Sequence, residues 1–173
     1  MFGAALKGEI DVRKDRGVLY RKHADLGVRV NTPIDGLMLG VNYRRVYTLA
    51  EVGWLVENRP YIQLEQKVKS NNKLDWRFRL RQEFRYREEK ENSQRSRFRV
   101  KLKLPHQLFN AKPFLSNEYF YDLTSHKLSQ ARIEAGLTFQ QFKDVVPRLA
   151  FKVTGKQKSQ WQTSSAIVLS IAF

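Results

Sequence analysis

Apolar and polar side chains alternate with a period of two along most of the chain. In residues 76–87 nearly every even position is aromatic or aliphatic and nearly every odd position is arginine, and residues 95–104 repeat the pattern. Successive side chains of a strand point to opposite faces, so this spacing predicts two strands with one apolar and one basic face. A helix would scatter the same arginines around its circumference and leave no apolar stripe.

The same alternation recurs in eight further segments, which are residues 6–13, 18–30, 37–47, 54–69, 114–123, 128–139, 145–153 and 164–173. Turn-forming Asn, Gly, Pro and Ser residues stand between them, and no segment has a helical period. We therefore predict an all-β chain of about ten sequential antiparallel strands. An even number of such strands closes into an up-and-down β-barrel without free edges, here as a single domain over residues 1–173.

The length of the expected strands indicates which face lies outside. A tilted strand crosses a bilayer with ~9–11 residues, whereas strands of soluble proteins average nearer ~5–6. Tyr and Trp residues also cluster near the strand ends, as in interfacial girdles. We therefore expect a transmembrane barrel with its apolar face toward lipid and its polar face toward the lumen. Lys22 and Asn58 are polar exceptions on the outer face, and Lys22 can snorkel toward a rim.

A soluble barrel is the alternative at this stage. A lipocalin-like or fatty-acid-binder-like barrel would turn the same apolar face inward and bind an anionic small ligand. Alternation alone does not distinguish the two arrangements, because both have one apolar and one polar face.

Composition narrows the possibilities. The chain has 173 residues, a formal net charge of +15 and no cysteine, so disulfides and thiolate metal sites are excluded. No apolar run approaches the ~18 residues of a transmembrane helix. We find no signal peptide. If the protein is exported, we therefore expect this sequence to be its mature or trimmed chain with a start methionine.

The predicted inner face carries many more cations than carboxylates. Its basic wall consists of Arg77, Arg79, Arg81, Arg85, Arg97, Arg99, Lys101, Arg132 and Arg148. The carboxylates expected to pair with it are Glu57, Glu65, Glu83, Glu118, Asp122 and Glu134.

This excess of positive charge predicts a hydrated lumen with a preference for small anions, because a buried ion without a partner costs several kcal/mol. A barrel of ten strands is small, so any path through it is narrow. An interior that is filled by ion pairs and serves only the structure is the other reading of the same residues.

Signals for an enzyme are poor. His23 and Asp25 share the inner face and form a possible acid–base pair, but a histidine bonded to a carboxylate explains them equally. Metal-ligand spacings and glycine-rich phosphate loops are absent, so we expect no catalytic residue, metal or cofactor. A small outer-membrane enzyme that modifies lipids or cleaves proteins is the third hypothesis.

Nucleic acid is the partner that a basic chain first suggests. Binding of single strands requires aromatic rings on the same face as the basic residues. Phe78 and Phe84 lie instead on the face opposite the arginines. We therefore expect no nucleic-acid partner.

Several segments resemble a known family. They read "WLVENRP", "LRQEFRYR", "RFRVKLKLP", "SNEYFYDL" and "QARIEAGLTF", with W-x-x-E-x-R-P and N-E-x-F as the most distinctive motifs. They are similar to the bacterial outer-membrane barrel family known as domain of unknown function 2490, from about the second strand to the end. The resemblance implies a barrel in the outer membrane of a Gram-negative bacterium, with the lipid bilayer as partner, and it implies no activity. Contact of basic residues at the rims with the phosphates of lipopolysaccharide is a third possible role of the positive charge.

The last residue, Phe173, resembles the terminal aromatic signal that the barrel-assembly machinery recognises in its substrates. If the first strand rises from the periplasm, both termini lie at the periplasmic end. Residues 88–94 and 155–159 are then outer loops, and residues 71–72 form a periplasmic turn.

Overall fold

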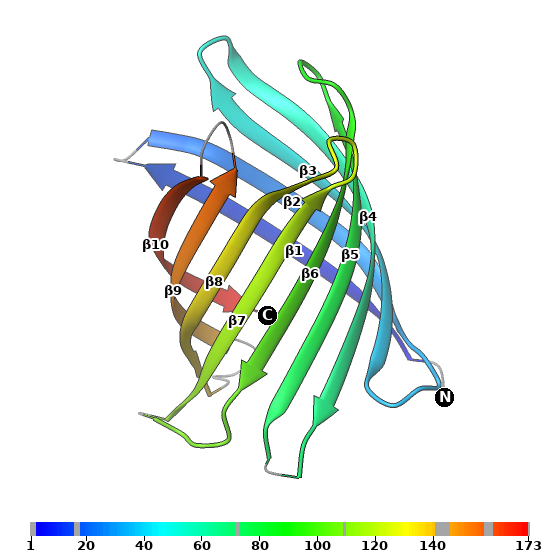
Figure 1. Cartoon of the computed structure of the whole chain (residues 1–173), viewed down its shortest axis with the longest axis vertical. Helices are drawn as coiled ribbons and strands as arrows, with labels where there is room; N and C mark the ends of the chain where they lie inside the picture. Colours follow the sequence, from blue (N-terminus) through cyan, green and yellow to red (C-terminus); the bar gives the residue numbers. More distant parts are fainter. Residues whose placement is uncertain are drawn as a thin grey trace. The chain divides into compact units, whose positions relative to one another are not determined.

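A computed structural model describes residues 3–15, 18–71, 73–108, 110–140, 146–157 and 161–172, without the side chains of residues 11, 13–15, 161 and 165–172. These residues form strands and loops (Figure 1). The strands are β1 (Ala4–Asp15), β2 (Val18–Asn31), β3 (Leu37–Ala50), β4 (Gly53–Lys69), β5 (Asp75–Arg87), β6 (Ser93–Lys103), β7 (Ala111–Asp122), β8 (Lys127–Phe139), β9 (Val146–Gln157) and β10 (Trp161–Ala172). No helix of the described residues is long and apolar enough to cross a membrane.

The ten strands form one sheet in which each strand pairs with the next along the chain. This confirms the prediction of an all-β chain of ten sequential antiparallel strands. The order runs from β1 to β10, and no pairing between β10 and β1 is present among the described residues. Closure of the sheet into a barrel is therefore part of the proposal made below.

Two of the predicted loops are shorter than expected. Gly155, expected as the first residue of an outer loop, lies within β9 and pairs with Ala131 of β8 and with Thr163 of β10. Pairing of β9 with β8 and with β10 keeps the backbone extended at Gly155, although apolar and polar side chains no longer alternate there. Residues 158–159 of the predicted loop lie outside the described residues, as does residue 72 of the predicted turn. β6 likewise begins at Ser93, so the loop before it spans residues 88–92.

The described residues belong to two compact units. The first contains Met1–Glu65, Leu80–Ser96 and Asp122–His126, and the second contains Gln66–Arg79, Arg97–Tyr121 and Lys127–Phe173. The expectation of a single domain stays a prediction.

The polar face of the strands is the buried face in both units. In the first unit Asp25 is 4% exposed, whereas its neighbour Leu26 is 66% exposed. In the second unit Ser116 is 5% exposed, and the adjacent Leu115 is 53% exposed. Water-soluble proteins bury apolar side chains and expose charged ones, so this sheet has the reverse distribution. The residues predicted for the polar face are thus the buried ones at these positions, and those predicted for the apolar face are the exposed ones.

The two polar exceptions on the apolar face have partners there. The ammonium group of Lys22 lies 4.8 Å from the ring centroid of Trp54 and 5.3 Å from that of Tyr47. Asn58 accepts a hydrogen bond of 2.7 Å from the Tyr43 hydroxyl. Cation–π contact and hydrogen bonding thus reduce the cost of placing polar groups among apolar ones.

Close packing of β8 against β9 generates a prediction about stability. A Cβ atom at Gly136 would lie 2.2 Å from the backbone oxygen of Leu149 and 2.7 Å from the Cα atom of Ala150. At Gly8 of β1 nothing lies within 4 Å of such an atom. We expect Gly136→Ala to destabilise the protein by about 1–3 kcal/mol, the usual cost of overpacking. Gly8→Ala is the matched control and should leave the urea unfolding midpoint unchanged. Equal midpoints for the two variants would contradict the described register.

Candidate functional site

A buried carboxylate, Asp25, organises the first unit. Arg44 donates to its Oδ2 atom from Nε at 2.7 Å and from Nη2 at 2.5 Å. The Tyr61 hydroxyl donates to the same oxygen at 2.6 Å. Asp25 and Arg44 stand opposite each other in the register of β2 and β3, which explains the short contact. Charge-assisted bonds of this kind are the strong ones in protein interiors.

Glu9 stands opposite Asp25 in the register of β1 and β2. Like charges at such positions destabilise a sheet, and three basic groups offset the repulsion. Lys7 Nζ lies 2.9 Å from Glu9, His23 Nε2 lies 3.2 Å from it, and Arg44 Nη2 lies 3.5 Å from it. His23 thus contacts a carboxylate, which is the simpler of the two roles considered for it from the sequence.

Glu57 of β4 holds two arginines. Arg85 Nε donates to its Oε1 atom at 2.5 Å and Arg85 Nη2 to its Oε2 atom at 3.2 Å. Arg59 Nη2 lies 3.0 Å from Oε1. The bidentate contact with Arg85 fixes the geometry of the carboxylate as well as its charge.

Glu83 of β5 is surrounded by further arginines and is 1% exposed. Arg95 Nη2 donates to it at 2.5 Å, and Arg81 and Arg59 lie 3.6 Å and 3.8 Å away. Arg81 also donates to Gln63 Oε1 at 2.9 Å. In this unit Glu9, Glu57 and Glu83 therefore each contact more than one cation, whereas Asp25 contacts Arg44 through two donors.

Glu118 of β7 is the centre of the second unit. Arg79 Nη2 and Arg97 Nη2 donate to its Oε1 atom at 2.7 Å and 2.8 Å, and Arg132 Nη1 donates to its Oε2 atom at 3.2 Å. β5, β6 and β8 each supply one of these guanidinium groups. Three cations thus share one buried carboxylate, and we call these four residues the Glu118 cluster.

Two aromatic rings lie beneath the cations of this unit. The guanidinium carbons of Arg97 and Arg132 are 4.5 Å and 5.0 Å from the ring centroid of Phe120. The ring of Phe114 likewise lies near two cations, Lys101 and Arg148. Neither ring was assigned to the buried face from the sequence, although both have the same parity as Glu118. Both rings are buried.

A second ion pair lies near Phe114. Arg148 Nη2 is 2.6 Å from Glu134, and the Arg148 guanidinium is 4.3 Å from the Phe114 centroid. Lys101 Nζ lies 3.9 Å from the same centroid. The aromatic face attracts these cations where carboxylates are few.

The remaining predicted residues have different surroundings. Arg77 is half-buried and lies 3.5 Å from Asp75, and Arg99 is half-buried on β6. Glu65 is 5% exposed, and it forms no ion pair within the described residues. Phe173, predicted as the assembly signal, lies outside the part of the chain that the structure describes.

Asp122 closes the turn at the end of β7. Its Oδ1 atom accepts hydrogen bonds of 3.0 Å from the backbone N–H groups of Thr124 and Ser125. Aspartate commonly closes turns in this way. Its role as a partner of the basic wall stays a prediction.

The balance of charge differs between the two networks. In the first unit, four carboxylates face six cations, which are Glu9, Asp25, Glu57 and Glu83 with Lys7, Arg44, Arg59, Arg81, Arg85 and Arg95. In the Glu118 cluster one carboxylate faces three arginines. The ratio of cations to carboxylates is thus higher in the Glu118 cluster. That the predicted cations form one continuous wall stays a prediction.

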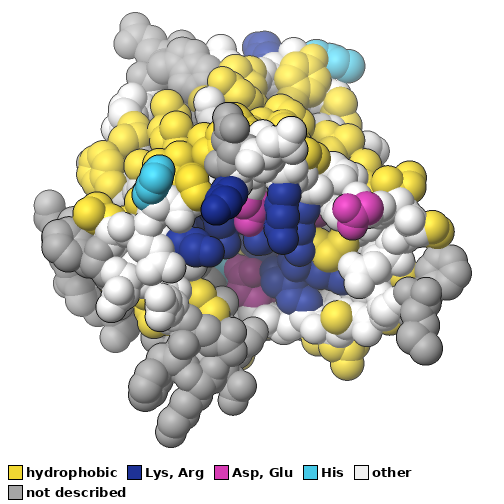
Figure 2. Space-filling view, turned by 90° about the horizontal axis from the view of Figure 1, so that it is seen from below, with side chains coloured by type: hydrophobic (Ala, Val, Ile, Leu, Met, Phe, Trp, Pro, Cys, Tyr) yellow, Lys and Arg dark blue, Asp and Glu magenta, His cyan; other side chains and the backbone are white. Residues whose placement is uncertain are grey.

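The space-filling view shows Lys and Arg side chains beside Asp and Glu side chains, and hydrophobic side chains in separate areas (Figure 2). Within the described residues no group of three or more histidine, aspartate or glutamate side chains is arranged to hold a metal ion.

Comparison with known proteins gives one match. The family model described as "Protein of unknown function (DUF2490)" matches residues 9–150. A search of curated proteins finds no match. The matched range contains the networks of Asp25, Glu57, Glu83 and Glu118.

Sharing of one carboxylate by three arginines generates a prediction. Glu118→Gln keeps the size of the side chain but leaves Arg79, Arg97 and Arg132 without their common negative charge. Removing one partner of a buried ion pair costs about 3–5 kcal/mol, and we expect a loss of this order in the free energy of unfolding. Glu89→Gln, in the exposed loop before β6, is the control. Urea unfolding measures both, and a midpoint for Glu118→Gln equal to that of the control would show that the cluster does not stabilise the fold.

Proposed function

The chain belongs to the family described as protein of unknown function (DUF2490), and on this premise we propose that it is an outer-membrane β-barrel protein of a Gram-negative bacterium. Its basic interior binds small anions and offers them a narrow path. The observation that carries the proposal is the reversed distribution of side chains, with charged groups buried and apolar groups exposed.

The exposed apolar face supports contact with lipid. Leu6 and Ile10 of β1 are each 82% exposed, and large apolar side chains are exposed on β2 to β9 as well. Contiguous apolar surface of this extent is rare on soluble monomers. The strands contain 11 to 17 residues, enough to cross a bilayer when tilted. A soluble barrel with a ligand in an apolar interior fits this distribution poorly.

The membrane also supplies a reason for closure. An open sheet edge in lipid leaves backbone N–H and C=O groups without partners, and each such group costs several kcal/mol. Pairing of β10 with β1 removes both edges at once. In membrane barrels the polar face of each strand points to the interior. There the cations and carboxylates of each network neutralise one another.

The cation surplus of the second unit supports anion binding. Three guanidinium groups around one carboxylate retain a net positive charge, and guanidinium favours carboxylate and phosphate. Rings of basic side chains select anions in membrane pores. In the first unit four carboxylates share the cations, which supports a structural role for that part of the interior.

The exterior near the ends of β2, β3 and β4 supports contact with lipopolysaccharide. Lys22 lies over Trp54 and Tyr47, and the Arg45 guanidinium lies 5.4 Å from the Tyr47 centroid. Aromatic rings favour the membrane interface, and the two cations suit the phosphates of lipopolysaccharide. With the first strand rising from the periplasm, this patch faces the outer leaflet. Assembly by the barrel-assembly machinery, with Phe173 as its signal, belongs to the same proposal.

Location and closure generate the next prediction. We expect the protein to sediment with outer membranes of expressing cells. A closed barrel resists detergent until it is boiled, so the unboiled and boiled samples should differ in gel mobility. Recovery in the soluble fraction, with the same mobility before and after boiling, would refute the membrane barrel.

Anion preference is tested by recording across a planar bilayer in a salt gradient. We expect a small conductance whose reversal potential indicates anion selectivity, and Arg132→Gln should shift that potential toward the value for cations. Lys127→Gln, on the exposed first residue of the same strand, removes the same charge outside the cluster and should have no effect. A cation-selective wild-type protein would refute the proposal. Absence of conductance would refute the anion path and favour an interior that is filled by ion pairs.

A further inference from the structure

A second basic site lies in the second unit, at the ends of β6, β7 and β8, apart from the Glu118 cluster. It is a pocket with a volume of about 400 Å³. Its cations are Lys103, the last residue of β6, and Lys112, near the start of β7. Lys112 is exposed and Lys103 is half-buried.

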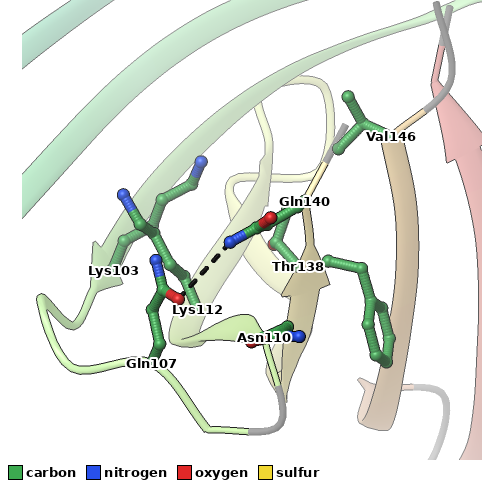
Figure 3. Close-up of a pocket in the computed structure, with 8 residues that line it drawn as sticks. Lys103, Gln107, Asn110, Lys112, Thr138, Gln140 and Val146 are labelled. Atoms are coloured by element: carbon green, nitrogen blue, oxygen red, sulfur yellow. Dashed lines mark hydrogen bonds between the residues drawn. The ribbon is translucent and has the colours of Figure 1, made fainter. Parts of the chain in front are cut away.

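The rest of the lining is neutral and rich in hydrogen-bonding groups. Gln107, Asn110 and Gln140 supply three carboxamides and Thr138 supplies a hydroxyl, while apolar side chains complete the wall. Figure 3 shows both lysine side chains beside the carboxamides of Gln107 and Gln140. The eight lining residues include no carboxylate. The pocket is therefore positive but offers many neutral donors and acceptors.

The wall of the pocket is held in place by its own hydrogen bonds. Leu108 and Ala111 exchange backbone hydrogen bonds of 2.8 Å and 2.9 Å, and Asn110 between them has a φ of 57°, in the left-handed region that asparagine tolerates. Gln140 Nε2 donates to Gln107 Oε1 at 3.4 Å, which connects this loop to the end of β8. This hydrogen bond uses one N–H of Gln140 and the oxygen of Gln107, so each carboxamide can form further hydrogen bonds. A preformed wall of this kind lowers the entropic cost of binding.

The charges around Lys103 are mostly positive. The charged groups that act on it most strongly are Arg77, Asp75, Lys112 and Arg148, three cations and one carboxylate. Arg97, Arg99, Lys101 and Lys103 also follow one another on the same face of β6. This row leads from the pocket to the Glu118 cluster.

We infer that this pocket binds the phosphomonoester of a small sugar or polyol. A phosphomonoester carries about −1.5 to −2 charges at neutral pH, which two ammonium groups can neutralise. Hydroxyl groups both donate and accept hydrogen bonds, as carboxamides do, whereas a phosphate ion alone would leave the carboxamide oxygens unused. The volume is at the small end of the range for ligand pockets, about 300–1,000 Å³, and exceeds the needs of a bare phosphate.

Calorimetric titration of the full-length protein in detergent tests the inference, with glucose 6-phosphate, inorganic phosphate and glucose as probes. We expect glucose 6-phosphate to bind roughly tenfold or more tightly than inorganic phosphate, since one to two further hydrogen bonds are worth this factor. Glucose should show no measurable binding. Equal affinities for glucose 6-phosphate and phosphate would overturn the inference, because the pocket would then select charge alone.

Variants locate the binding. Lys103→Gln combined with Lys112→Gln should weaken binding of glucose 6-phosphate at least roughly tenfold. Lys90→Gln combined with Lys127→Gln removes the same charge from exposed positions outside the pocket and should preserve binding. Retained affinity in the pocket variant would overturn the assignment. The comparison of probes on the wild-type protein needs no variant, so a folding defect does not remove the test. It also needs no bilayer, and failure of conductance leaves its outcome unaffected.

Discussion

Burial of charge on one face of the sheet is the constraint on which the rest of the structure depends. A buried ion is tolerated only when opposite charge and hydrogen bonds surround it. Asp25, Glu57, Glu83 and Glu118 meet this requirement because each receives guanidinium groups from neighbouring strands. The same constraint sends the apolar side chains to the opposite face, where protein does not cover them.

The two networks satisfy the constraint in different ways. In the first unit four carboxylates share six cations, and Tyr61 and Gln63 complete the hydrogen bonding. Around Glu118 one carboxylate serves three guanidinium groups, and the ring of Phe120 lies against two of them. The Glu118 cluster therefore has the higher ratio of positive to negative charge.

The sequence alone predicted the strands and their faces, because a period of two is a local property of the chain. It did not predict that three arginines share Glu118, since that depends on the lateral register of four strands. Tyr61 and Phe120 have the parity of the buried face, but the predicted wall consists of charged residues and does not include them. Asp122 has the parity of an inner residue, but it stands at a strand end, where a turn offers its carboxylate closer backbone donors. The pocket at Lys103 combines strand ends with a loop, which alternation does not describe.

The central claim is that the exposed apolar face contacts lipid while the buried polar face does not. The chain contains no cysteine, so single cysteines can carry a fluorophore at adjacent positions of one strand. Val41 and Asn42 form such a pair on β3, and Leu115 and Ser116 form another on β7; in each pair the first residue is exposed and the second is buried. In vesicles containing brominated lipid, we expect quenching of labels at Val41 and Leu115 and little quenching at Asn42 and Ser116. Equal quenching within each pair, or no quenching at Val41 and Leu115, would contradict this account.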